Sequence, residues 1–87
     1  MIYQITYELN SETKDYANFF AELNNFFSSV QFLKNSWFVK SSKGSSEISN
    51  TLQKLIDEKD SLFVCRFERA DIAGWISSSA VKWLKDN

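Results

Sequence analysis

The stretch DYANFFAELNNFFS, residues 15–28, decides the fold of this chain. Its large apolar side chains recur at steps of three and four, the spacing that places side chains on one face of a helix. This spacing predicts one amphipathic helix over residues 15–28, with Thr13 or Asp15 as its N-terminal cap. We expect the apolar face to cover one side of a sheet. The residues on that face are Tyr16, Phe19, Phe20, Leu23, Phe26 and Phe27.

Three β-prone segments accompany this helix. Residues 2–9, IYQITYEL, alternate with a period of two, as a half-buried strand does. Residues 61–68, SLFVCRFE, alternate in the same way. Residues 30–41, VQFLKNSWFVKS, form either one long bent strand or a hairpin that turns at Asn35-Ser36, and the pattern leaves both possibilities open.

Two further helices are expected from the spacing of apolar residues. One contains Ile48, Leu52, Leu55 and Ile56, and a short terminal one lies between residues 76 and 84. The resulting order, β-α-β(β)-α-β with a tail, predicts a single α+β domain over residues 1–87. We expect a ferredoxin-like βαββαβ sandwich, with an antiparallel sheet, two helices on one face and a C-terminal extension.

Alternation along the strands assigns side chains to the two faces of the expected sheet. We expect Tyr3, Ile5 and Tyr7 to face the helices together with Phe63 and Phe67. The opposite face would then mix polar and apolar side chains, which on a small domain is typical of a dimer interface. The predicted interface residues are Gln4, Thr6, Leu62, Val64 and Arg66.

The composition excludes several classes of site. The chain has no histidine, which removes Ser-His-Asp and Cys-His pairs and His-rich metal sites. A lone Cys65 cannot form an internal disulfide or a CxxC motif, and two glycines cannot supply a dinucleotide fingerprint. A net charge of −1 gives no bulk electrostatic reason to bind nucleic acid. With no visible signal peptide and no long apolar run, we expect a cytoplasmic protein without a membrane partner.

Glu8 is the candidate functional carboxylate. It ends the first strand on the face away from the helices, where a dimer would bring two copies of it together. With Asn10 nearby, such a pair would hold a divalent cation, Mg²⁺ or Mn²⁺, through oxygen ligands. The alternative is an exposed charge at the end of a strand, paired with Lys40 or Arg66.

Other aromatic and sulfur side chains have structural interpretations. We expect Trp75 and Trp83 to close the open end of the core, whereas an exposed tryptophan in this tail would be a partner anchor. Trp37 and Phe38 alternate along a strand, so we expect core packing for one and interface packing for the other. Cys65 is expected to be buried and inert.

The chain resembles small bacterial proteins of the SinR family along nearly its whole length. Five segments carry this resemblance, and most of them are core patterns. ITYELN (5–10) resembles the family's (I/L)SYDLN, SWFVK (36–40) its STWLVK, the Glu47-Ile48 to Leu52 helix its EIRDxL, DSLFV (60–64) its D-x-L-x-V, and Gly74-Trp75 with Trp83-Leu84-Lys85 its GW…WLK tail.

This family is similar to the second CRISPR-associated protein and to virulence-associated protein D. The resemblance implies a ferredoxin-like homodimer, and some of these relatives are metal-dependent nucleases. Their catalytic acid is an Asp that closes the first strand after a Tyr, and the matching pair here is Tyr7-Glu8. Glutamate is longer by one methylene, so it would displace a metal that is held by two short carboxylates.

The expected function is therefore a non-enzymatic homodimer that acts as a binding or adaptor module for a protein partner. One alternative is a weak metal-dependent endonuclease, acting on RNA or DNA, with Glu8 at a metal site in the dimer. Another is an inhibitor from a mobile element that binds a host complex.

Overall fold

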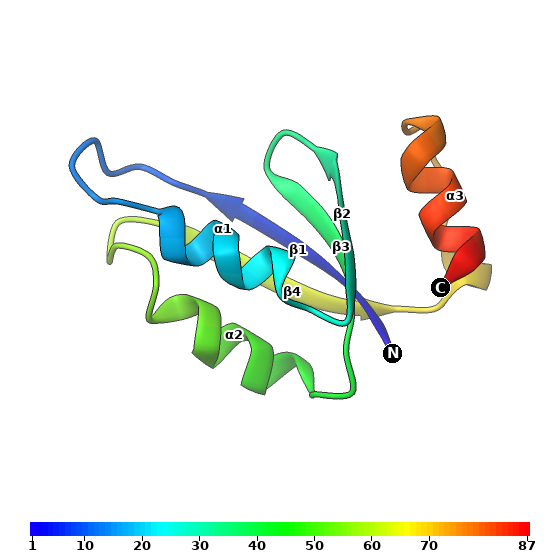
Figure 1. The fold of residues 1–87 in the computed structure, drawn as a ribbon, viewed down its shortest axis with the longest axis horizontal. Coiled ribbons are helices and arrows are strands. Elements are labelled where there is room, and N and C mark those ends of the chain that lie inside the picture. Colours follow the sequence, from blue (N-terminus) through cyan, green and yellow to red (C-terminus); the bar gives the residue numbers. More distant parts are fainter.

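A computed structural model describes all residues, 1–87. The chain forms a four-stranded antiparallel sheet in the order β2-β3-β1-β4, with three helices (Figure 1). This α+β architecture is compatible with the expected ferredoxin-like sandwich. The elements are β1 (Ile2–Glu8), α1 (Ala17–Asn24), β2 (Ser28–Leu33), β3 (Ser36–Lys40), α2 (Ser45–Gln53), β4 (Ser61–Phe67), a short 3-10 turn η1 (Arg69–Asp71) and α3 (Ser78–Asp86).

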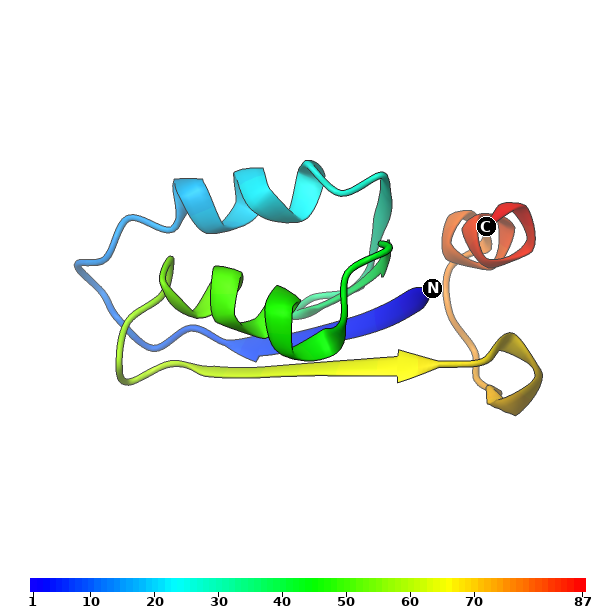
Figure 2. The ribbon, with the colours of Figure 1, turned by 90° about the horizontal axis from the view of Figure 1, so that it is seen from below.

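The main core lies between one face of the sheet and the helices α1 and α2. Figure 2 shows both helices on the same side of the strands. Ile5 of β1, Phe19 of α1 and Leu52 of α2 are completely buried at its centre. The other members of this core are Tyr3, Tyr7, Leu23, Trp37, Val39 and Ile48.

The helix predicted over residues 15–28 is shorter in the structure. α1 ends at Asn24, and the backbone N–H of Asn25 closes its last turn by donating to the carbonyl of Glu22. Asparagine is a poor helix former, so two in succession favour an end to the helix at this point. Phe27 consequently lies outside the helix and is 86% exposed, which makes its predicted place on the apolar face wrong.

α1 begins at Ala17, two residues after the predicted start, and its N-cap residue is Tyr16 instead of Thr13 or Asp15. The Asp15 carboxylate accepts a hydrogen bond of 2.9 Å from the backbone N–H of Ala17, at the first turn. Phe20 keeps its ring near those of Tyr7 and Phe19, with centroids 6.0 and 5.4 Å away, although it is 36% exposed. The aromatic face therefore covers the sheet through Phe19 and Leu23, with Phe20 at its margin.

Residues 30–41 belong to a hairpin, which decides between the two possibilities left open by the sequence. β2 and β3 pair in antiparallel fashion, and Lys34-Asn35 form the turn between them. The Gln31 side chain supports this turn by donating a 3.0 Å hydrogen bond to the carbonyl of Lys34. The register shifts between Gln31 and Leu33, so an irregularity precedes the turn.

The predicted faces of β4 are reversed in the structure. Val64 lies opposite Ile5 in the ladder, and paired residues share one face of a sheet, so Val64 packs against the main core. Phe63 lies on the other face and is 64% exposed, and Cys65 is half-buried there instead of fully buried. Consecutive apolar residues at 62–65 gave the alternation no basis for choosing a face, and a shift by one residue exchanges the two faces.

The third helix packs on the opposite side of the sheet from α1 and α2. In Figure 1, α3 lies across the β2–β3 hairpin from the other two helices. Ala80 and Trp83 of α3 are buried against Ile2 and Phe38 in a second, smaller core. The longest helices have nine residues, and none has the length and hydropathy needed to cross a membrane.

We expect Phe19→Ala to lower the free energy of unfolding by about 3–5 kcal/mol, because it leaves a cavity in the main core. Phe19 is completely buried, and its ring centroid lies 5.0 Å from that of Tyr7. Phe27→Ala is the matched control, and it should cost less than about 1 kcal/mol because this ring is exposed. Urea denaturation measures both values, and equal losses would contradict this account of the core.

Candidate functional site on the second face of the sheet

The second face is the side of the sheet that points away from α1 and α2. In the ladder, Gln4 lies opposite Phe38 and Cys65, and Thr6 lies opposite Ser36. These polar side chains are linked: Gln4 Nε2 donates to Thr6 Oγ1 over 3.1 Å, and the hydroxyls of Thr6 and Ser36 are 2.9 Å apart. The second face consists of Val30, Phe32, Ser36, Phe38, Lys40, Ile2, Gln4, Thr6, Glu8, Phe63, Cys65 and Phe67.

The five predicted interface residues do not lie on one face. Gln4 and Thr6 are on the second face, as expected, whereas Leu62, Val64 and Arg66 point to the side of the helices. Leu62 and Val64 pack against the main core, and Arg66 lies 3.6 Å from Glu68 in an exposed ion pair. Phe63 and Phe67 take their places on the second face.

Glu8 is exposed at the end of β1, opposite Ser61. It forms no ion pair with either predicted partner. Lys40 Nζ instead lies 5.7 Å from the Phe27 ring centroid, and Arg66 pairs with Glu68. Within the chain, no group of three or more Cys, Asp or Glu side chains is arranged to hold a metal ion. A metal site at Glu8 therefore depends on a second copy, and it stays a prediction.

Asn10, the other expected metal ligand, belongs to a polar cluster around Asp60. The backbone N–H of Asn10 donates to Asp60 Oδ1 over 2.6 Å, and its side-chain amide donates to the carbonyl of Lys59 over 2.9 Å. Tyr16 Oη and the backbone N–H of Asp57 both donate to Asp60 Oδ2, each over 2.7 Å. Asp60 thus ties the end of β1 and the start of α1 to its own turn.

The hydrogen bonds to Asp60 lower the pKa of its carboxyl group. Desolvation is the largest single effect and acts in the opposite direction, but the donors from Asn10, Tyr16 and Asp57 together with the charge of Lys14 outweigh it. In the sequence, Asp60 is only one carboxylate in a charged run, and no pattern there predicts that it accepts these hydrogen bonds.

A cavity of about 370 Å³ lies between the second face and the C-terminal segment. Its volume is at the lower end of the range of small-molecule sites, roughly 300–1,000 Å³. Its walls are apolar except at Gln4, and no charged side chain lines it. The strands contribute Gln4, Phe32, Phe38 and Phe67, and the C-terminal segment contributes Ile72, Ala73, Gly74, Ile76, Val81 and Leu84.

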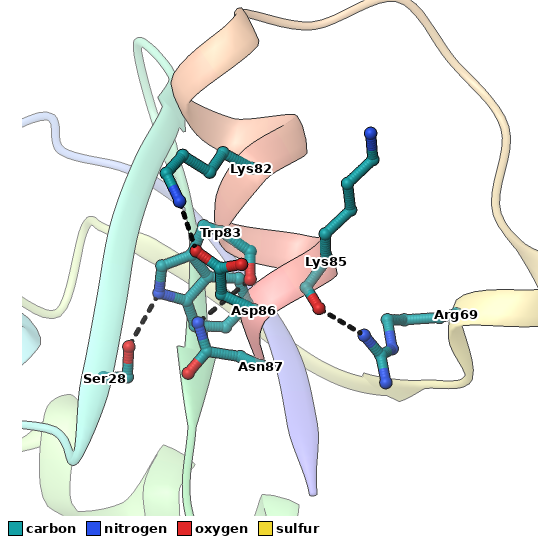
Figure 3. A network of polar contacts seen from close by, with 7 residues as sticks. All are labelled: Ser28, Arg69, Lys82, Trp83, Lys85, Asp86 and Asn87. Carbon is teal, nitrogen blue, oxygen red and sulfur yellow. Dashed lines mark hydrogen bonds and ion pairs between the residues drawn. The ribbon is translucent and has the colours of Figure 1, made fainter.

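Two side chains, Trp83 and Arg69, make three hydrogen bonds that hold the C-terminal segment beside this cavity. Figure 3 shows the contacts with Ser28 and Lys85. Trp83 Nε1 donates to Ser28 Oγ over 2.8 Å and fixes α3 to β2. Arg69 Nη1 donates to the carbonyls of Leu84 and Lys85 over 2.6 and 3.3 Å. These carbonyls lie at the C-terminus of α3, where a cation is also favoured by the helix dipole.

Trp75 does not close the core, unlike Trp83. It is 99% exposed, although its neighbours Gly74 and Ile76 both line the cavity. Ile72 and Val81, which also line the cavity, are 40% and 39% exposed. The C-terminal segment therefore lines the cavity with apolar residues, and Trp75 is an exposed tryptophan in this tail.

No family model, curated protein or solved structure matches the chain. The resemblance to the SinR family therefore stays a prediction.

We expect Asp60→Asn to lower the melting temperature at pH 7 by on the order of 5 °C, because an amide cannot accept all three donors well. The lowered pKa of Asp60 means that its stabilisation is present above the unfolded pKa, about 4, and is lost as the pH falls further. The difference between variant and unmodified chain should therefore shrink below about pH 4. Differential scanning calorimetry across pH tests this.

The matched control for this experiment is Glu58→Gln. Glu58 is an exposed carboxylate in the same turn that accepts no hydrogen bond from another residue. Its substitution should leave the melting temperature unchanged at pH 7 and at pH 3. An Asp60→Asn difference that is constant from pH 7 to pH 3 would show that the ionised carboxylate is not the stabilising group.

Proposed function

We propose that the protein is a non-enzymatic binding module that works as a cytoplasmic homodimer. The proposed fold is ferredoxin-like, βαββαβ, with α3 as a C-terminal extension. The strand order β2-β3-β1-β4 and the position of α1 and α2 on one face support this assignment. The second face, partly covered by α3, is the proposed region of contact between the two copies.

The observation that carries this proposal is the apolar surface around the cavity. Single exposed apolar side chains are ordinary on protein surfaces, but a contiguous group marks an interaction site. Trp75, Ile72 and Val81 form such a group in or next to the cavity wall, and Phe63 is 64% exposed on the same side of the sheet. A second copy would remove this surface from water.

Charge also favours self-association over nucleic-acid binding. The chain carries ten basic and eleven acidic residues, so two copies would repel each other only weakly. The cavity walls hold no charged side chain, so no ion would be buried without a partner on contact. Binding to RNA or DNA would instead require clustered Lys and Arg.

Sedimentation velocity on the unmodified chain tests this proposal. We expect a species of twice the chain mass of 10.1 kDa at micromolar concentration. The same preparation should leave RNA and DNA intact in the presence of Mg²⁺ or Mn²⁺. A strictly monomeric protein would contradict the homodimer, and metal-dependent cleavage that Glu8→Ala abolishes would replace the binding module with a nuclease.

A further inference from the structure

Trp75 is the largest apolar group that the chain leaves in water. Its side chain is 99% exposed, whereas Trp37 and Trp83 are both buried. Burying an indole removes roughly 150–250 Å² of surface from water, so leaving it exposed is costly unless a partner covers it. The two residues beside it, Gly74 and Ile76, line the cavity, so Trp75 projects from the cavity wall without filling the cavity.

The cavity is large enough to receive an indole, and its polarity suits one. It measures about 370 Å³ and is apolar, with Gln4 as its single polar side chain. Gln4 uses its Nε2 to donate to Thr6, and its Oε1 accepts no hydrogen bond within the chain. Because no buried side-chain oxygen lacks a partner, this Oε1 is open to solvent and can accept from a partner. A buried indole is apolar except for one N–H donor, and that donor needs an acceptor.

Trp75 lies in the segment that lines one side of the cavity. A two-fold axis beside residues 72–76 would place Trp75 of each copy at the cavity of the other, because such an interface uses one surface patch twice. We infer that the two copies exchange Trp75, with each indole in the partner's cavity and its N–H donating to the partner's Gln4. This inference rests on the homodimer proposed above.

The area of this contact lies at the lower end of what protein–protein interfaces bury, which is the size of a weak dimer. Two indoles and the walls that receive them would bury roughly 600–1,000 Å². Ile72 and Val81, at 40% and 39% exposure, lie beside each cavity and would add to this area. The total then approaches the roughly 1,200 Å² at which stable protein–protein interfaces begin.

The test compares dimer dissociation constants by sedimentation equilibrium. Trp75→Ala should raise the dissociation constant at least about 100-fold, because each dimer loses two central anchors. Trp75→Phe keeps an aromatic ring without the N–H donor, and it should give an intermediate rise of about 10-fold or more. Neither variant should change the melting temperature of the diluted monomer, because this side chain has no contacts within the chain to lose.

Two further variants complete the design. Ile72→Glu places a charge at the mouth of the receiving cavity and should weaken the dimer as strongly as Trp75→Ala. Phe27→Ala removes an 86% exposed ring that does not line the cavity, and it should leave the dissociation constant unchanged.

The possible failures are distinguishable. A Trp75→Ala variant that dimerises as tightly as the unmodified chain would overturn the exchange and leave the homodimer standing. An unmodified chain that is monomeric would contradict both the homodimer and the exchange of Trp75. Loss of dimer in Phe27→Ala, with Trp75→Ala unaffected, would place the interface elsewhere on the molecule.

Discussion

The structure depends on covering both faces of β1, one of the two inner strands of the sheet. One face presents Tyr3, Ile5 and Tyr7, which are almost fully buried beneath α1 and α2. The other face also carries apolar groups, and α3 covers part of it. With 87 residues, the chain supplies two helices for one face and a single nine-residue helix for the other. The surface that α3 does not cover is therefore a consequence of how this small chain distributes its helices.

Polar groups inside the domain are satisfied, which lets so aromatic a core remain ordered. Trp37 Nε1 donates to Tyr7 Oη over 3.1 Å, and Tyr3 Oη donates to the carbonyl of Lys43 over 2.6 Å. No buried side-chain nitrogen or oxygen lacks a partner. Each such bond prevents a desolvation cost of about 1–3 kcal/mol. The apolar surface around Trp75 thus belongs to a domain in which every buried polar side-chain atom has a hydrogen-bond partner.

The strands and helices of the fold could be predicted from sequence. The face to which each side chain of β4 points, and the packing of the C-terminal segment, could not. Alternation at residues 2–9 identified β1, and the spacing of Phe19 and Leu23 identified α1, because both patterns are local. β4 was assigned the wrong face because Leu62 to Cys65 are apolar at every position. The side on which α3 packs depends on where the chain turns after β4, and no local pattern records that. The cavity, and the exposure of Trp75 beside it, follow from that turn.

The central claim is that another copy of the chain completes the second face by burying Trp75. Tryptophan fluorescence tests it without any substitution, because Trp37 and Trp83 are buried in the single chain and only Trp75 is exposed. The account predicts that the emission shifts to shorter wavelength as the concentration rises through the range in which the dimer forms. Dimer formation with no change in emission would contradict it, because Trp75 would then remain in water.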